Sequence, residues 1–246
     1  MRLTKHIHLV GSGKLGFGIS NELDCHVYLI DGGSECALID AGVGLNIDAI
    51  IENVRADGID VAKVRHVYLT HAHADHAGGC KQWKDRFGVS VSASVAAATF
   101  ISQGDETGIS LAAAKAGGFY PQEYRFSACP VNQVLKEGDT VKVGALTLKV
   151  LETPGHCMGM LSFLLSVGGK SYLFSGDTVF HSGKILLTNV YDCDLQQYVS
   201  SLHKLGALQI DGLLPGHFSV VLNGAVGHLR QATDCLGRMA LPPNIL

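Results

Sequence analysis

Short apolar runs alternate with glycine-bearing turns along most of the chain, and amphipathic segments lie between them. The runs predict β-strands at 26–31, 35–40, 64–70, 146–153, 160–167 and 170–176. Apolar residues at helical spacing predict helices from Asn46 to about Gly58, from Asp194 to Gly206, and from about Ala225 to Met239. Helices of this kind bury their apolar side on a sheet, so the pattern predicts an α/β fold of sheets covered by helices.

Two stretches repeat one local pattern. VYLIDGGSECALIDAG (27–42) and SFLLSVGGKSYLFSGD (162–177) each run strand, glycine turn, strand, then a glycine beside an acidic residue. A chain built of two similar halves would show this repeated pattern. Hairpins of this kind are also common, so both interpretations, duplication and two unrelated hairpins, stay open. Between the halves, residues 94–130 are alanine-rich, broken by glycine and then aromatic. This composition predicts two short helices and a loop inserted over another part of the molecule.

Composition narrows the class of protein. The chain has 246 residues, of which 47% are hydrophobic and 17% charged, as expected of a globular protein. The net charge is -3 and no run of Lys or Arg is present, so nucleic acid is not expected as a partner. No apolar run is long enough to span a membrane. The seven cysteines are odd in number and form no CxxC pair, which is typical of reduced thiols. We therefore expect a soluble cytoplasmic protein.

The stretch THAHADHAGG (70–79) follows one of the predicted strands and holds three histidines and an aspartate within six positions. In extended chain, His71 and His73 point to the same side and can converge on one point. If a helix then begins, Asp75 and His76 are carried to a neighbouring point. A loop capped by Asp75 would explain the aspartate but not three imidazoles, so the stretch predicts ligands for two adjacent metal sites.

Three further residues of ligand type each come directly after an apolar run. His156 follows LTLKVLET, Asp177 follows KSYLFSG, and His217 follows IDGLL. Functional side chains in α/β proteins commonly lie on loops at strand ends, where a rigid scaffold holds them. A catalytic zinc needs about three protein ligands and an open position, so these residues can complete the sites that the first stretch begins.

The series HAHADH, then His156, Asp177 and His217, resembles the metallo-β-lactamase superfamily over essentially the whole chain. The resemblance implies an αββα sandwich of two mixed β-sheets flanked by helices, forming a single domain over 1–246. It also implies a dinuclear centre. His71, His73 and His156 would hold one metal, Asp75, His76 and His217 the other, with Asp177 as the bridge. Asp40 matches a conserved element of the family and either orients a ligand histidine or closes a turn before Gly42.

The chemistry implied is metal-assisted hydrolysis by a bridging hydroxide, with Asp75 as a catalytic proton carrier. Two divalent ions are expected, zinc first, with iron or manganese also compatible with these ligands. The expected reaction is cleavage of an ester, thioester or lactone bond in a small molecule. Hydrolysis of a phosphodiester or phosphotriester on the same site is an alternative. A second alternative is a mononuclear-iron persulfide dioxygenase, whose ligands would be a subset of these.

Comparison with branches of the family narrows the substrate. Glyoxalase II enzymes carry a long helical C-terminal segment, whereas 29 residues follow His217 here, which argues against glutathione thioesters. Acyl-homoserine lactonases commonly place a tyrosine where this chain has Phe180. True β-lactamases carry Cys or Ser at the equivalent of Asp177, and this chain departs from them. Phe180, His181 and Lys184 are candidate substrate contacts; an exposed turn is the alternative for the last two.

Two other segments bear on access to the site. The glycine-rich stretch 11–18 fits no phosphate-binding pattern and predicts a hairpin flap with Phe17 over the site. Phe119, Tyr120 and Tyr124 have three open roles: lining a pocket, forming a contact in a homodimer, or packing in the core. Cys157, beside His156, is either a ligand-like thiol or a small packed residue.

Overall fold

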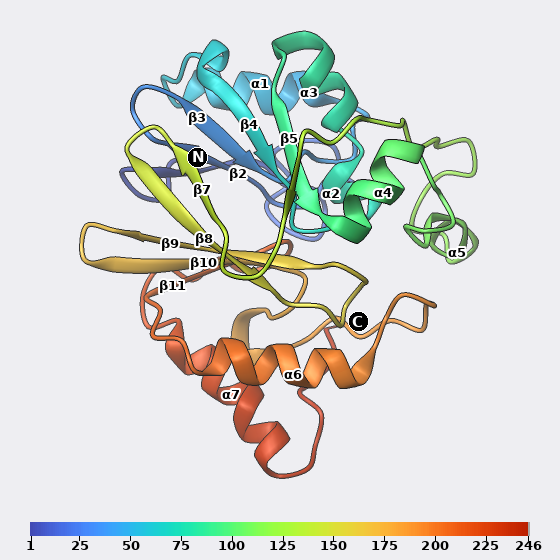
Figure 1. Ribbon diagram of the computed structural model, residues 1–246, viewed down its shortest axis with the longest axis vertical. Helices are drawn as coiled ribbons and strands as arrows, with labels where there is room; N and C mark the ends of the chain where they lie inside the picture. The colour runs from blue at the N-terminus through green and yellow to red at the C-terminus, as the bar shows by residue number, and fades with distance from the viewer. Residues whose placement is uncertain (246) are drawn as a thin grey trace.

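Two mixed β-sheets lie face to face, with helices on both outer surfaces (Figure 1). The computed structural model describes residues 1–245. The first sheet has the order β1 (Ile7–Gly11), β2 (Val27–Asp31), β3 (Cys36–Ile39), β4 (Val64–Tyr68), β5 (Ser90–Ser94) and β6 (Gln133–Leu135). The second has the order β11 (Gly212–Pro215), β10 (Lys170–Gly176), β9 (Leu161–Val167), β8 (Leu146–Glu152) and β7 (Thr140–Val143). The predicted αββα sandwich is confirmed.

Seven α-helices are described: α1 (Ile47–Ala56), α2 (Ala74–Ala77), α3 (Cys80–Phe87), α4 (Val95–Gln103), α5 (Leu111–Ala116), α6 (Leu195–Gly206) and α7 (Val226–Gly237). Asn46 caps α1 by accepting from the Ala49 amide, and Asp194 caps α6 by accepting from the Gln197 amide, as the sequence predicts. The buried side of α7 is formed by Leu229 and Ala232. The segment 94–130 contains α4 and α5, in agreement with the expectation of two short helices.

The two similar stretches of sequence, 27–42 and 162–177, adopt the same arrangement of strands. β2 and β3 form an antiparallel hairpin, and β3 then pairs with β4 in parallel. β9 and β10 form an antiparallel hairpin, and β10 then pairs with β11 in parallel. This shared topology agrees with the interpretation of two similar halves.

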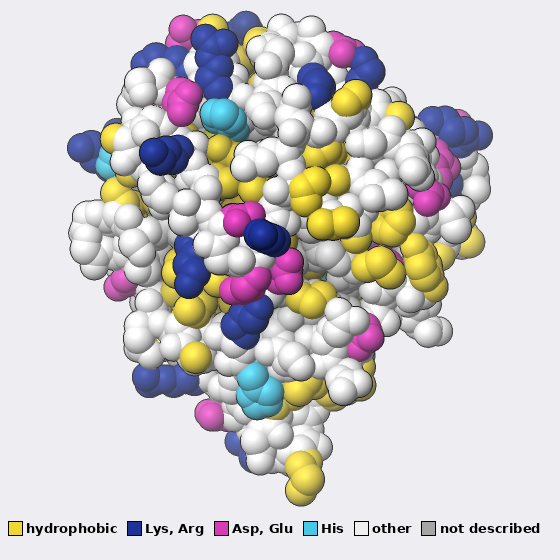
Figure 2. All heavy atoms as spheres, viewed as in Figure 1, with side chains coloured by type: hydrophobic (Ala, Val, Ile, Leu, Met, Phe, Trp, Pro, Cys, Tyr) yellow, Lys and Arg dark blue, Asp and Glu magenta, His cyan; other side chains and the backbone are white. Residues whose placement is uncertain are grey.

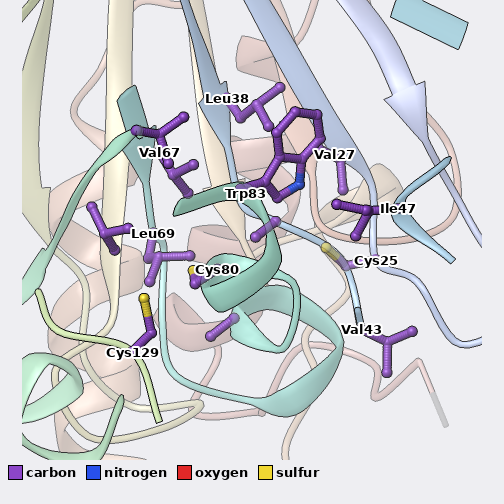
Figure 3. Close-up of a cluster of buried hydrophobic side chains, with 14 of the residues drawn as sticks. Cys25, Val27, Leu38, Val43, Ile47, Val67, Leu69, Cys80, Trp83 and Cys129 are labelled. Atoms are coloured by element: carbon purple, nitrogen blue, oxygen red, sulfur yellow. The ribbon is translucent and has the colours of Figure 1, made fainter. Parts of the chain in front are cut away.

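The strands can be predicted from the sequence because both faces of each sheet are covered. Along β2, Val27 and Leu29 belong to the cluster under the helices, whereas Tyr28 and Ile30 belong to the cluster between the sheets. A strand buried on both faces reads as a continuous apolar run. Figure 3 shows the outer cluster, in which the fully buried Trp83 of α3 packs among side chains of the first sheet.

The sheet topology decides where functional residues can meet. β8 and β10 are each antiparallel to β9, and β11 is parallel to β10, so β8, β10 and β11 end at one edge of the second sheet.

Figure 2 shows charges of both signs interspersed over the face in view. Among residues 1–245, no helix combines the length and the apolar character that crossing a lipid bilayer requires.

Candidate metal centre

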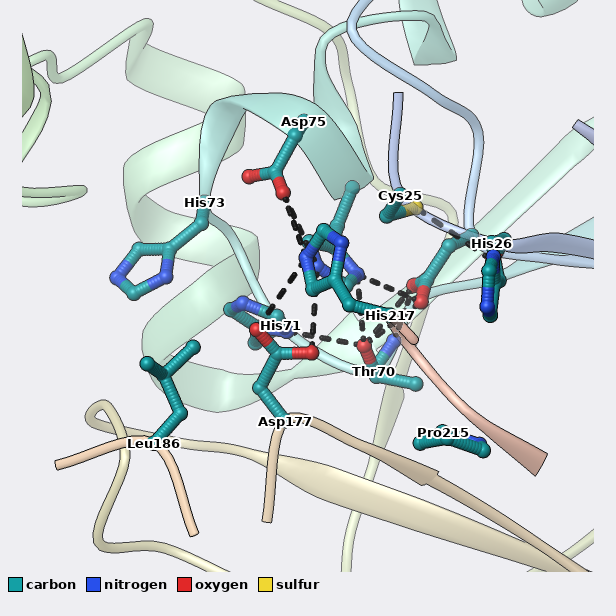
Figure 4. A network of polar contacts seen from close by, with 12 residues as sticks. Cys25, His26, Thr70, His71, His73, Asp75, Asp177, Leu186, Pro215 and His217 are labelled. Atoms are coloured by element: carbon teal, nitrogen blue, oxygen red, sulfur yellow. Dashed lines mark hydrogen bonds and ion pairs between the residues drawn. The ribbon is translucent and has the colours of Figure 1, made fainter. Parts of the chain in front are cut away.

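Where β4, β8, β10 and β11 end, seven histidine and aspartate side chains from separate parts of the chain meet, and Figure 4 labels His71, His73, Asp75, Asp177 and His217 among them. They are the residues that the sequence analysis singled out: His71, His73, Asp75, His76, His156, Asp177 and His217. Five of them are buried, and His73 and Asp75 are half-buried. The fold therefore brings the predicted set of side chains together.

The first four residues of the set lie together because the chain changes from extended to helical within them. His73 is in an extended conformation and precedes α2, whose first turn carries Asp75 and His76. The ring centroids of His71 and His73 are 4.6 Å apart, and those of His71 and His76 are 4.0 Å apart. The predicted convergence of the histidines and the predicted helical turn after them are both present.

The remaining residues complete two neighbouring groups. His73 Nδ1 lies 3.1 Å from His156 Nε2, and Asp75 Oδ2 lies 3.1 Å from His217 Nε2. Asp177 lies between the groups, with its Oδ2 3.8 Å from His156 Nε2 and 3.5 Å from His217 Nε2. Gly216 permits this approach, because a Cβ there would collide with Asp177 Oδ1 and lie 2.7 Å from His76 Cε1.

Hydrogen bonds on the outer side of three rings fix which nitrogen faces the centre. His76 Nδ1 lies 2.8 Å from Asp40 Oδ2, and His156 Nδ1 lies 2.8 Å from the Leu186 carbonyl. Both partners only accept, so Nδ1 donates and, in the neutral ring, Nε2 keeps its lone pair. Of the two roles left open for Asp40, this contact supports orientation of a ligand histidine.

His71 is held in the same way through Thr70. The Thr70 hydroxyl lies 2.9 Å from Asp40 Oδ2 and 2.9 Å from His71 Nδ1. Because the hydroxyl donates to the carboxylate, it accepts from His71 Nδ1, and His71 Nε2 is left with a lone pair. One buried carboxylate thus orients a histidine in each of the two groups.

The inward-facing atoms suit a cation. His71 Nε2, His76 Nε2 and Asp177 Oδ1 are buried and have no hydrogen-bond partner within residues 1–245. Leaving a buried polar atom without a partner costs about 1–3 kcal/mol. Imidazole nitrogen and carboxylate oxygen are ligands for divalent transition metals, so the residues present fit such an ion.

Comparison with known proteins identifies the family. The profile described as "Metallo-beta-lactamase superfamily" matches residues 20–217. This chain belongs to that superfamily. Membership of the superfamily, together with the names of the relatives, confirms the prediction of a metal-dependent hydrolase. Superfamily members generally bind divalent metals, often zinc.

Two curated relatives and one solved structure illustrate the likeness. The chain is 29% identical over 236 residues to "Acyl-coenzyme A thioesterase MBLAC2" of Bos taurus, covering 88% of this chain and 80% of that one. It is 27% identical over 198 residues to "Thioesterase pkgB" of Emericella nidulans, covering 80% of this chain and 47% of pkgB. The subclass B3 metallo-β-lactamase BJP-1 of Bradyrhizobium japonicum shares the fold, with a TM-score of 0.73, 23% identity, and coverage of 97% and 91%.

Burial and neighbouring groups shift the pKa values of the site histidines in both directions. For His76 and His217 the neighbouring acidic groups outweigh burial and raise the pKa, whereas two other histidines shift the opposite way. Burial and the neighbouring imidazoles lower the pKa of His71 well below its ordinary value, and burial with His73 lowers the pKa of His156 to about 4. Both rings are therefore neutral, the form that binds metals, at neutral pH. Burial would raise the pKa of Asp75, but the facing His76 and His217 outweigh it, so its pKa is lowered and it stays ionised.

The centre borders a cavity of about 390 Å³. Five of the seven residues line it: His73, Asp75, His156, Asp177 and His217. The remaining lining is largely apolar and comes mainly from 109–120, from 186–190, and from the N-terminal segment 14–24, which includes part of the flap. Leu15, not the predicted Phe17, faces the cavity from the flap, while the Phe17 ring lies 5.5 Å from that of His26. Of the three aromatics with open roles, Phe119 and Tyr120 line the cavity.

Two residues that contact the centre were not assigned this role by sequence reasoning. Asp192 is buried, with Oδ2 facing His73 Nε2 at 3.4 Å and Oδ1 accepting from the Ser110 hydroxyl at 2.6 Å. Tyr120 donates to Asp75 Oδ1 at 2.8 Å and accepts from the Asp75 amide at 3.1 Å. Asp192 lies in no motif, and Tyr120 stood out only as one of several aromatics.

The candidate substrate contacts Phe180, His181 and Lys184 do not line the cavity. Phe180 is fully buried and packs edge-on against Phe218 at 5.9 Å. The chain then turns through a 3-10 helix (His181–Gly183) and places the His181 ring 4.6 Å from His228 of α7. His181 and Lys184 are exposed in this turn, in agreement with the alternative stated for them. Phe180 was expected as a substrate contact, but it is buried away from the cavity.

Proposed function

We propose that the protein is a thioesterase that hydrolyses an acyl thioester of a small molecule at a dinuclear centre. The observation that carries the proposal is the set of buried, partnerless nitrogen and oxygen atoms that converge beside a largely apolar cavity. The names of the two curated relatives supply the bond class, since both are named as thioesterases, one of them as an acyl-coenzyme A thioesterase.

Two divalent ions, zinc first, fit the donor set as two groups. We assign His71, His73 and His156 to one ion, Asp75, His76 and His217 to the other, and Asp177 to both. When bound, the ions supply activation of water at neutral pH and polarisation of the attacked carbonyl. No serine or cysteine nucleophile is required for this route.

The chain's own residues position the reaction. Asp75 borders the cavity with one carboxylate oxygen held by Tyr120 and the other facing His217, which suits a role as proton carrier between the attacking water and the leaving thiol. Asp40 and the Leu186 carbonyl keep the rings of His76 and His156 oriented. The apolar lining excludes bulk water from the carbonyl that is attacked.

The cavity favours a thioester over the phosphoester alternative. Among its described lining residues, Lys14 is the one cation, whereas a phosphodiester or phosphotriester site commonly uses several charged donors on the phosphoryl group. The mononuclear-iron alternative is disfavoured because Asp75, His76 and His217 are as closely assembled as the other group.

The test is release of free thiol from acyl-coenzyme A substrates by the metal-loaded protein, compared with Asp177→Asn. Removal of the shared carboxylate is expected to reduce kcat/KM by about 100-fold or more, because it disturbs both groups. Asp211→Asn is the matched control, since Asp211 accepts from the Ser171 amide away from the centre. Equal rates for the wild type and Asp177→Asn, or oxygen uptake on a persulfide without hydrolysis, would contradict the proposal.

A further inference from the structure

The side chains that line the cavity beside the centre indicate which class of ligand the cavity binds. Ile109, Leu111 and Leu186 line it and are themselves buried, whereas Phe119 and Leu15 line it and are 52% and 36% exposed. The cavity therefore runs between the ligand residues and solvent along an apolar wall, with an apolar rim. An apolar wall of this kind binds a ligand by removing hydrocarbon surface from water.

Charge on the lining argues against an ionised acyl group. Apart from the ligand residues, the charged side chains that line the described cavity are Lys14, Glu22 and Asp24. Asp24 is already bonded to the Val43 amide and the Ser20 hydroxyl. The parts of the lining formed by 109–114 and 186–190 contain no ionised side chain that would neutralise a carboxylate carried by the acyl group. A buried charge without a partner is costly, so these two parts of the lining, which are distinct from the exposed Lys14, favour an uncharged group.

We propose that this cavity is an acyl-binding subsite for an uncharged aliphatic chain, and that the segment 109–120 sets the chain length accepted. The inference rests on the proposed thioesterase function and adds to it the class of acyl group and the element that selects it.

The segment is well placed for this role because polar contacts to the centre hold it at both ends. Ser110 donates to Asp192, which faces His73, and Tyr120 donates to Asp75. Between these two contacts, α5 presents Ala113 and Ala114 to the cavity. Their small side chains leave space that a larger residue would fill, and the two contacts keep this wall in a fixed position relative to the reacting carbonyl.

The experiment measures kcat/KM for straight-chain acyl thioesters from acetyl upward, and for succinyl thioester as the charged analogue. If the chain enters the apolar cavity, kcat/KM rises about fourfold for each added methylene until the cavity is full. Succinyl thioester is expected to react more slowly than the uncharged substrate of equal length. A series without dependence on length, or a preference for succinyl thioester, would overturn the inference.

Matched variants on one helix locate the subsite. Ala114→Leu is expected to depress kcat/KM for the longer chains at least tenfold more than it depresses kcat/KM for acetyl thioester. Ala112→Leu, on the same helix but outside the lining, is expected to match the wild type. Ala113→Leu, at an exposed position that lines the cavity, provides the same comparison if Ala114→Leu does not fold. Identical chain-length profiles for the Ala112 and Ala114 variants would refute the assignment of α5.

A binding measurement separates this inference from the proposed function. If no thioester is hydrolysed, the thioesterase proposal fails, and the subsite is then tested by calorimetric titration with decanoate and with acetate. Tighter binding of decanoate that is weakened by Ala114→Leu but not by Ala112→Leu supports the subsite. Equal affinity for decanoate and acetate in the wild type overturns it.

Discussion

Asp40 provides a sharp test of how the centre is organised. Its carboxylate is 1% exposed and accepts from His76 Nδ1, from the Thr70 amide at 2.8 Å and from the Thr70 hydroxyl. The residue has a φ of 64°, in the left-handed region that Asn and Asp tolerate better than other non-glycine residues. Asp40→Asn therefore keeps the shape and the backbone while changing one acceptor oxygen into a donor.

The consequence of Asp40→Asn follows from hydrogen-bond polarity. The amide oxygen can still accept from Thr70, so the NH2 group faces the N–H of His76, and two donors oppose one another. The ring relieves this conflict by moving its hydrogen to Nε2, the atom that faces Asp75 and Asp177. Loss of such an outer partner typically lowers metal affinity about 10- to 100-fold, which corresponds to about 1.4–2.7 kcal/mol. We expect this loss at the ion assigned to His76.

The assay is competition for metal with a chromophoric chelator, which resolves tightly and weakly held ions. Asp40→Asn should release one ion at a lower chelator concentration than the wild type and keep the other nearly unchanged. Asp57→Asn is the control, because it makes the same change in a carboxylate bonded to His8 Nδ1 at 2.7 Å, outside the centre. Wild-type affinity for both ions in Asp40→Asn would refute this reasoning.

Three further predictions follow from the contacts described above. Tyr120→Phe removes the hydroxyl that fixes Asp75 and should lower kcat/KM by about 10- to 100-fold with the fold intact, as steady-state kinetics and circular dichroism would reveal. Asp192→Asn should weaken metal binding by only about tenfold, because its contact with His73 is long at 3.4 Å; a chelator titration measures this, and an unchanged affinity would count against a positioning role. Phe163→Ala should lower the free energy of unfolding by about 3–5 kcal/mol in urea denaturation, because Phe163 is fully buried between the sheets, and a loss below about 1 kcal/mol would contradict the packing described.

The parts of the fold that could be predicted from sequence are those whose burial leaves a pattern. β2 and β9 are buried on both faces for most of their length, and apolar residues predominate in both, although β9 also contains Ser162 and Ser166. β6 has one buried residue in three, and β7 alternates exposed and buried positions over only four residues. Such short, half-exposed strands carry too little pattern to be distinguished from loops.

The seven residues of the candidate centre could be singled out because four of them lie within six positions and the other three each follow an apolar run. Asp192 and Tyr120 could not be assigned in this way. Asp192 reaches His73, and Tyr120 reaches Asp75, only through the tertiary fold. Asp192 and Tyr120 are contacts that the sequence analysis missed, whereas Phe180 is one that it predicted and the structure lacks. Phe180 is close to Asp177 in sequence, but it is buried against Phe218 and does not line the cavity.

The central claim is that the seven residues hold two metal ions, and metal content per chain tests it most directly. Elemental analysis of protein purified without added metal, and again after saturation with zinc and removal of excess, should give about two ions per chain for the wild type. Asp177→Asn should give fewer, and Asp211→Asn should match the wild type. One ion or none in the saturated wild type would contradict the dinuclear centre.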